Sequence, residues 1–289
     1  MNSGVNNISL IGVDLGGTKV EAGFVRDNEI LKKNYNLIDG KSEDPMVITN
    51  QIIKTIEPLF DKSIKGIGIG VPSLVNRNKG IVYDVQNIPS WKKVHLAEII
   101  QKEFNVPVFI DNDANCYALG EFILGKENEN DLFIGVTLGT GVGSGIISSG
   151  HLLEDANCGS GEFGSIPYLD GIYEDYCSGK FFQDHYNEKG EHLLTRARNR
   201  EPDALKAYAE FGTHLGNFIK TIMYATDPKK ISIGGSVAGS KEFFLKSMIK
   251  TINTFSYKRS VINLNISFTE NKNSAVFGAA SLYIDRMNL

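Results

Sequence analysis

The chain has 289 residues, with 30 Lys and Arg against 34 Asp and Glu, and 42% of its residues are hydrophobic. The net charge of −4 argues against binding to the phosphate backbone of a nucleic acid, because such proteins gather Lys and Arg on one face. The apolar content is enough to fill one large core or two smaller ones, so a disordered chain is excluded.

The cysteines and the N-terminal residues indicate the cellular compartment of the protein. Cys116, Cys158 and Cys177 have neither the number nor the spacing of a disulfide framework or a CxxC metal pair. The first apolar run, ISLIGV, is too short for a signal sequence or a membrane span. We therefore expect a cytoplasmic protein with no membrane partner.

The first half of the chain alternates strands and helices. Its apolar pattern predicts strands at 8–14, 20–26 and 29–35, a helix within 42–60, a strand at 66–71, a helix at 94–104 and a strand at 106–110. The first two strands are joined by a Gly-Gly turn, which we expect to supply the positive φ of a tight hairpin. Strands interleaved with helices predict an α/β sheet with parallel neighbours.

The second half begins by repeating this design. IGVTLGTGVGSGII resembles the opening IGVDLGGTKVEAGF, which predicts an internal duplication. Further elements are expected at 203–226 (helix), 231–235 (strand), 240–253 (helix), 264–269 (strand) and from Ser274 onward (helix). We expect two α/β lobes, residues 1–115 completed by the helix at 274–289, and residues 116–273.

The two glycine turns are candidate phosphate sites. Successive backbone N–H groups that no side chain covers form a concavity for phosphate oxygens, and two such turns suggest a polyphosphate. Neither turn fits GxxxxGK[ST] or GxGxxG, so P-loop and Rossmann sites are disfavoured. Ordinary hairpin turns remain the alternative.

Polar residues stand at two predicted element ends. Asp14 ends a strand before the first turn, where a carboxylate either holds Mg²⁺ or caps the strand. The string Asp111-Asn112-Asp113 precedes a helix, so one of its residues is the N-cap. The others are open to a ligand, and a carboxylate at a helix N-terminus can accept a proton from a substrate hydroxyl.

Five motifs, in this order, resemble the ROK family of sugar kinases: VDLGGTK, FIDNDANCYALGE, LGTGVGSG, GEFG and ISIGGSV. The resemblance implies the two-lobed, actin-like ATPase fold, related to ribonuclease H, with a mixed sheet and flanking helices in each lobe. It also implies a hexose kinase that uses ATP and Mg²⁺ and forms a homodimer.

Site residues follow from this resemblance by position. Asp113 would be the catalytic base, and the sugar would contact Asn87, Asn112, Glu162 and Glu174. The nucleotide and Mg²⁺ would be bound by Asp14, Gly16, Gly17, Thr18, Lys19, Gly139, Thr140, Gly141, Gly234 and Gly235, with Asp14 as the metal ligand.

The chain departs from the family pattern at one place. Ser165 stands where the family has a sugar-contacting His, and the CxCGxxGC element that should follow is missing. Because this His and three Cys hold zinc in other members, we expect no structural zinc here. The loss of the His also leaves open which sugar, and which of its hydroxyls, is used.

Two other function classes are weighed against the kinase. One is a sugar-sensing regulator that acts through a protein partner; the first turn begins near residue 11, so we expect no DNA-binding domain ahead of it. The other is an ATPase machine of the actin or chaperone type, for whose extra subdomains the chain is short. An assay of phosphorylation with a panel of hexoses would distinguish these three functions.

Overall fold

The computed structural model describes residues 8–156, 159–269 and 271–287, so Cys158 lies outside the described residues. The chain divides into two compact units. Unit 1 consists of Met1–Asn128, His151–Ser160 and Lys272–Leu289, and unit 2 of Glu129–Gly150 and Gly161–Asn271. This division differs from the expected boundary at 115/116, because helix α3 (Asp113–Leu124) packs against helix α10 (Ser274–Met287) and so belongs to unit 1.

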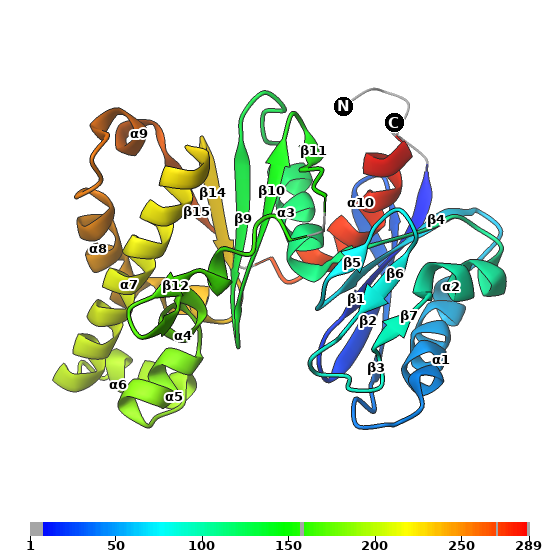
Figure 1. The fold of residues 1–289 in the computed structure, drawn as a ribbon, viewed down its shortest axis with the longest axis horizontal. Coiled ribbons are helices and arrows are strands. Elements are labelled where there is room, and N and C mark those ends of the chain that lie inside the picture. The colour runs from blue at the N-terminus through cyan, green and yellow to red at the C-terminus, as the bar shows by residue number, and fades with distance from the viewer. Residues whose placement is uncertain (1–7, 157–158, 270, 288–289) are drawn as a thin grey trace. The chain divides into compact units, whose positions relative to one another are not determined.

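Unit 1 is built on a five-stranded mixed sheet (Figure 1). In sheet order its strands are β3 (Glu29–Leu37), β2 (Lys19–Arg26), β1 (Ser9–Leu15), β4 (Ile64–Val71) and β8 (Val108–Asn112). β1 is antiparallel to β2 and parallel to β4, and β4 is parallel to β8. The predicted hairpin, third strand and parallel neighbours are confirmed.

The other elements of unit 1 are helices α1 (Pro45–Ile56), η1 (Glu57–Leu59) and α2 (Leu96–Phe104) and strands β5 (Val75–Asn76), β6 (Ile81–Tyr83), β7 (Lys93–Val94) and β11 (His151–Leu152). α1 begins at Pro45, which needs no backbone donor there, and the Asp44 side chain accepts from the Met46 N–H at 2.8 Å. The short strands β5 to β7 were not predicted, because two or three residues show no periodicity.

Helix α10 packs closely on β4 and on α3. A Cβ at Gly68 would overlap the carbonyl oxygen of Ala279, and a Cβ at Gly278 would overlap that of Cys116. Backbone can approach backbone this closely only where a side chain is missing. The last helix of the chain is thereby joined to the sheet and to the helix that begins at Asp113.

Unit 2 repeats the strand order of unit 1. Its strands β10 (Val142–Ser148), β9 (Phe133–Leu138), β14 (Lys230–Gly234) and β15 (Asn265–Phe268) are neighbours in that order. β9 is antiparallel to β10 and parallel to β14, and β14 is parallel to β15. The strands β2-β1-β4-β8 pair in the same way, so the predicted duplication is present in the topology of the sheets.

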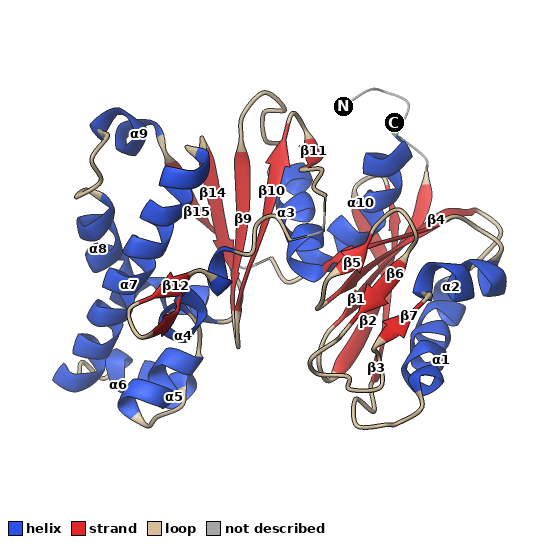
Figure 2. Cartoon of the chain, in the orientation of Figure 1, coloured by secondary structure: helices blue, strands red, loops and turns tan. Residues whose placement is uncertain are grey.

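Helices make up most of the rest of unit 2 (Figure 2). Its other elements are η2 (Phe163–Ser165), β12 (Pro167–Tyr168), β13 (Gly171–Ile172), α4 (Tyr173–Cys177), α5 (Lys180–Tyr186), α6 (Gly190–Arg198), α7 (Pro202–Thr226), η3 (Val237–Ser240), α8 (Lys241–Ile252) and α9 (Lys258–Asn263). α7 buries its predicted apolar stripe and packs against α8. None of the described helices combines the length and the apolar character of a membrane span.

Candidate functional site

The first glycine turn joins β1 to β2 through residues 16–18. The Gly16 N–H closes the turn by donating to the Lys19 carbonyl oxygen at 2.9 Å. The prediction of positive φ in this turn is wrong, since neither Gly16 nor Gly17 is in the left-handed region. A turn of this length between the paired Leu15 and Val20 does not require the primed geometry of a two-residue hairpin.

The loop that carries Asn87 lies against this turn. A Cβ at Gly17 would be 3.4 Å from Asn87 Nδ2, so the two residues are in contact. The loop is fixed by the buried Trp91, whose indole N–H donates to the Pro45 carbonyl oxygen at 2.9 Å. The hydrogen bonds of the described residues do not use the N–H groups of Gly17 and Thr18. These two donors are available to a ligand.

Asp14 is the penultimate residue of β1 and pairs with Glu21 on β2. Removal from water, together with the negative charge of Glu21, raises the pKa of Asp14 to about 6. A nearby cation would relieve this cost, and a carboxylate oxygen is the kind of donor that Mg²⁺ takes. Asp14 therefore fits a divalent cation. Thr137 holds the matching position before the second turn, so only the first of these two matching positions is a carboxylate.

The Lys19 side chain lies on Glu21. Its Nζ is 2.5 Å from Glu21 Oε2 and 5.7 Å from the centre of the Tyr35 ring, and Lys33 also pairs with Glu21. To bind a phosphate, Lys19 would have to leave this carboxylate. Its phosphate contact stays a prediction.

Asp113 is the first residue of α3, directly after β8. Asn112 is the N-cap: its Oδ1 accepts from the N–H groups of Ala114 at 2.8 Å and Asn115 at 3.4 Å. Its Nδ2 donates to the Ser73 carbonyl oxygen at 3.3 Å. One residue of the motif is therefore the cap, as predicted. Since both ends of the Asn112 amide have partners, its contact with a sugar stays a prediction.

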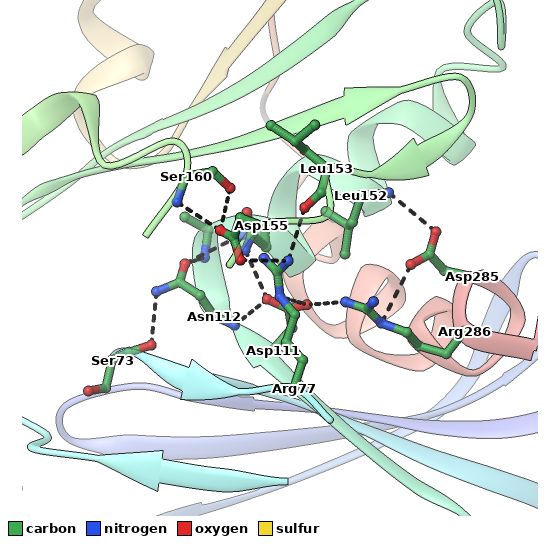
Figure 3. Close-up of polar contacts among 12 residues, drawn as sticks. Ser73, Arg77, Asp111, Asn112, Leu152, Leu153, Asp155, Ser160, Asp285 and Arg286 are labelled. Carbon is green, nitrogen blue, oxygen red and sulfur yellow. Dashed lines mark hydrogen bonds and ion pairs between the residues drawn. The ribbon is translucent and has the colours of Figure 1, made fainter. Parts of the chain in front are cut away.

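Asp111 is held by two arginines (Figure 3). Its Oδ2 is 2.9 Å from Arg77 Nε and 3.0 Å from Arg286 Nη2. Its Oδ1 accepts from the next backbone N–H and from Asn115 Nδ2, both at 2.8 Å. These partners occupy both oxygens of a buried carboxylate. Asp111 thus holds in place the connection between β8 and α3, where Asp113 lies.

Arg77 has a second set of partners in unit 1. Its Nη1 donates to the Leu153 carbonyl oxygen at 3.0 Å and lies 3.5 Å from Asp155 Oδ1, and Asp155 in turn accepts from the N–H and hydroxyl of Ser160 (Figure 3). Arg77 and Arg286 were missed at the level of sequence. Nothing in the sequence indicates that the β5-β6 hairpin and the last helix meet at Asp111.

The buried thiol of Cys116 shows that the carboxylates of unit 1 are near one another. Burial and the charges of Asp111, Asp14 and Asp113 raise its pKa well above the usual value. Gly70 on β4 pairs with Asp14, and a Cβ at Gly70 would lie 3.1 Å from the Cys116 Sγ and 3.4 Å from the Asp113 Cα, so the end of β1 and the start of α3 lie close together. Within unit 1, the structure brings Asp113 to the neighbourhood of Asp14 and the first glycine turn.

The second glycine turn joins β9 to β10 through residues 139–141. The Gly139 N–H donates to the Gly141 carbonyl oxygen at 3.0 Å. Gly235 follows β14 with a φ of 90°, a conformation that strains other residues, and it packs on the backbone of Leu138. The second turn and Gly234–Gly235, both predicted to bind nucleotide, therefore meet in unit 2.

Glu174, in α4, reaches the same turn. Its Oε2 accepts from the Val142 N–H at 3.1 Å, and its Oε1 is 2.5 Å from Lys180 Nζ. Loss of water and the charge of Glu174 raise the pKa of Glu162. The two glutamates predicted for the sugar are thus near each other and near the turn. Ser165 is exposed in η2, and its N–H donates to the Glu162 carbonyl oxygen at 3.1 Å.

The stretch between Ser165 and Glu174 forms the β12-β13 hairpin, which aromatic side chains hold in place. Tyr168 stacks on Tyr173 with ring centres 4.2 Å apart, and its hydroxyl is 3.1 Å from His214 Nδ1. Burial lowers the pKa of His214. The described residues contain no group of three His, Cys, Asp or Glu arranged to hold a metal. The expected lack of zinc stays a prediction, which about one equivalent of zinc in the purified protein would contradict.

The predicted site residues divide between the units. Unit 1 contains Asp14, Gly16, Gly17, Thr18, Lys19, Asn87, Asn112 and Asp113, and unit 2 contains Gly139, Thr140, Gly141, Glu162, Ser165, Glu174, Gly234 and Gly235. Each unit therefore combines one glycine turn with residues predicted for the sugar.

Comparison with known proteins identifies the family. The sequence matches the ROK family over residues 10–286, nearly the whole chain. The chain belongs to the ROK family. A relative of this ROK protein, the glucokinase of Halalkalibacterium halodurans, is 26% identical over 286 residues, covering 86% of each protein. The xylose repressor of Bacillus subtilis is 27% identical over 300 residues, covering 95% of this chain and 77% of the repressor.

Solved structures give the same result for the fold. A ROK family glucokinase from Streptomyces griseus, in complex with glucose and AMPPNP, matches with a TM-score of 0.77 and 25% identity. The match covers 95% of this chain and 98% of that one. The predicted actin-like ATPase fold is confirmed.

Proposed function

We propose that this ROK protein is an ATP-dependent sugar kinase that transfers the γ-phosphoryl group to a hydroxyl of a hexose, such as glucose or fructose. One observation supports the proposal: Gly70 on β4 pairs with Asp14, and a Cβ at Gly70 would lie 3.4 Å from the Asp113 Cα, so the candidate base is near the part of β1 that leads into the first glycine turn. The likeness to glucokinases supports the choice of a sugar as acceptor.

In this proposal Asp113 is the general base. Its Oδ1 accepts from the Ala114 N–H at 2.8 Å, and its place in the first turn of α3 favours the carboxylate form. The carboxylate takes the proton from the sugar hydroxyl as the oxygen attacks the γ-phosphorus, and the bond between this phosphorus and the bridging oxygen breaks, so that ADP leaves. Asp111 and its arginines keep the Asp113 backbone in place during this step.

The phosphates and the nucleoside are assigned to the glycines. The N–H groups of Gly17 and Thr18, and those of Thr140 and Gly141 in the second turn, donate to phosphate oxygens, and Gly234–Gly235 border the adenosine. Asp14 would hold Mg²⁺, which supplies positive charge to the phosphate oxygens when it is bound. The cytoplasmic location and the homodimer belong to the same proposal.

The sugar is assigned to Asn87, Asn112, Glu162 and Glu174. Amide and carboxylate groups of this kind bind sugar hydroxyls in pairs and fix the orientation of the ring. Ser165 is shorter than the His that it replaces and carries no charge, so it enlarges this part of the site. Turnover with glucose, fructose, mannose, allose, N-acetylated hexosamines and β-glucosides, measured with ATP and Mg²⁺, identifies the substrate.

The substitution Asp113→Asn tests the base. We expect the fold and the affinity for nucleotide to remain, and turnover to fall by at least about a hundredfold, the scale of a lost general base. Steady-state kinetics and nucleotide titration measure both. Asp203→Asn, on the exposed side of α7, is the matched control and should leave turnover unchanged. Near-normal turnover in Asp113→Asn would refute the assignment.

A second candidate is a sugar-sensing regulator that acts through a protein partner. The likeness to the xylose repressor, at an identity close to that of the glucokinases, favours it. Binding of a hexose without release of ADP in a coupled assay would select this function over the kinase.

A further inference from the structure

Lys180 is a positive charge at the second glycine turn that the proposed function does not use. Its Nζ is 2.5 Å from Glu174 Oε1, while Glu174 Oε2 accepts from the Val142 N–H at 3.1 Å. A single carboxylate therefore separates the ammonium group from the backbone of the turn. The absence of a side chain at Gly141 makes this possible, because a Cβ there would overlap Glu174 Oε2.

The backbone next to Lys180 is fixed to the same turn. The Gly179 N–H donates to the Gly139 carbonyl oxygen at 2.8 Å, and the Lys180 N–H is 3.2 Å from Ser178 Oγ. The start of the lysine side chain thus has a set position. Its end is free to move, since 43% of the side chain is exposed and its four-carbon stem is flexible.

Charge balance in unit 2 requires a cation here. Burial and, after it, the negative charge of Glu174 raise the pKa of Glu162, so this part of unit 2 already holds two carboxyl groups close to each other. A polyphosphate at residues 139–142 would add further negative charge beside Glu174. The ammonium group of Lys180, paired with the carboxylate that contacts the turn, can offset this charge.

We propose that Lys180 binds the terminal phosphate of the nucleotide, leaving Glu174 when the donor enters and so freeing that carboxylate for the sugar. This assignment rests on the proposed function. We choose the terminal phosphate because the proposed function assigns the nucleoside to Gly234–Gly235 and the sugar to Glu174. Lys180 lies at the sugar end of the phosphate chain, where the γ-phosphate would be.

Calorimetric titration with AMPPNP, ADP and AMP tests the assignment in wild type, Lys180→Met, Lys180→Arg and Glu174→Gln. We expect Lys180→Met to weaken AMPPNP binding by about 10- to 100-fold, the range of one charged hydrogen bond. Its affinity for ADP should change less than about threefold, and Lys180→Arg should retain most of the AMPPNP affinity. Glu174→Gln should not weaken AMPPNP binding, because it removes the competitor for Lys180.

The controls separate charge from structure. Lys206→Met removes an exposed charge on α7 and should not change AMPPNP binding, and melting temperatures show that each variant is folded. If Lys180→Met and Glu174→Gln weaken AMPPNP equally, or if Lys180→Met binds it normally, Lys180 only supports the turn and the assignment fails while the kinase proposal stands. A wild type that binds none of the three nucleotides contradicts the kinase proposal, and this assignment with it.

Discussion

At the scale of single residues, the position of the Asp14 carboxylate lowers the stability of the folded protein. It lies near the end of a buried strand, opposite Glu21, and its pKa of about 6 is above the ordinary 3.8. Above pH 6 the folded protein must keep this carboxylate ionised in surroundings that favour the neutral acid. Such a cost is typical of residues retained for binding or catalysis.

The substitution Asp14→Asn should therefore stabilise the metal-free protein near pH 7, by roughly 2–3 kcal/mol at most, the value of the pKa shift. As the pH falls from 6 toward 3.8, folded wild type takes up a proton that the unfolded chain does not, so the difference should vanish near pH 4. Urea unfolding between pH 8 and pH 4 measures this, and kinase assays should show that the variant has lost activity. A variant less stable than wild type at pH 8 would contradict the argument.

The glycines near the two turns have different conformational requirements. The Gly-Gly of the first turn was expected to need positive φ, but the structure places that requirement at Gly235 instead. Sequence shows that a residue without a side chain is used. It does not show whether the reason is the backbone angle or the approach of a neighbouring group.

At the scale of elements, the packing of α10 depends on close contact between backbones. Gly278 lies inside this helix, and its Cα faces the Cys116 carbonyl oxygen on α3. In a helix interior without such a neighbour, Gly→Ala would stabilise by about 1 kcal/mol. Here the close contact with the Cys116 carbonyl oxygen should make the same substitution destabilising.

We expect Gly278→Ala to destabilise the protein by about 1–3 kcal/mol, the range of an overpacked core, because the helices must move apart. Thermal and urea unfolding measure the change. Gly239→Ala is the matched control, since a Cβ at that position meets nothing within 4 Å. Its stability should stay within about 0.5 kcal/mol of wild type. A stabilising effect of Gly278→Ala would show that α10 does not pack this way.

At the scale of the whole molecule, unit 1 is discontinuous in sequence. Its sheet is complete by residue 112, yet α10 comes from the end of the chain and covers β1 and β4. All of unit 2 precedes residue 272. The two units should therefore differ in their response to a truncation at the C-terminus.

A chain that ends at residue 271 should lose the fold of unit 1 and keep that of unit 2. Without α10 the apolar face of β1 and β4 is uncovered, whereas β9 and β14 keep their helices. Hydrogen exchange should show fast exchange in β1 and β4 and protection in β9 and β14. Restored protection on addition of a peptide of residues 272–289 is the positive control. Full protection of β1 in the truncated chain would contradict the prediction.

The sequence by itself determined the larger elements, the paired glycine hairpins and the positions of Asp14 and Asp113 at element ends. These follow from local rules: apolar periodicity, turn chemistry and capping depend on residues close together in the chain. Only the tertiary structure decided that Arg77 and Arg286 pair with Asp111, that Glu174 accepts from the Val142 N–H directly after the second turn, and that α3 belongs to unit 1. These contacts join residues far apart in the sequence, so no local pattern records them.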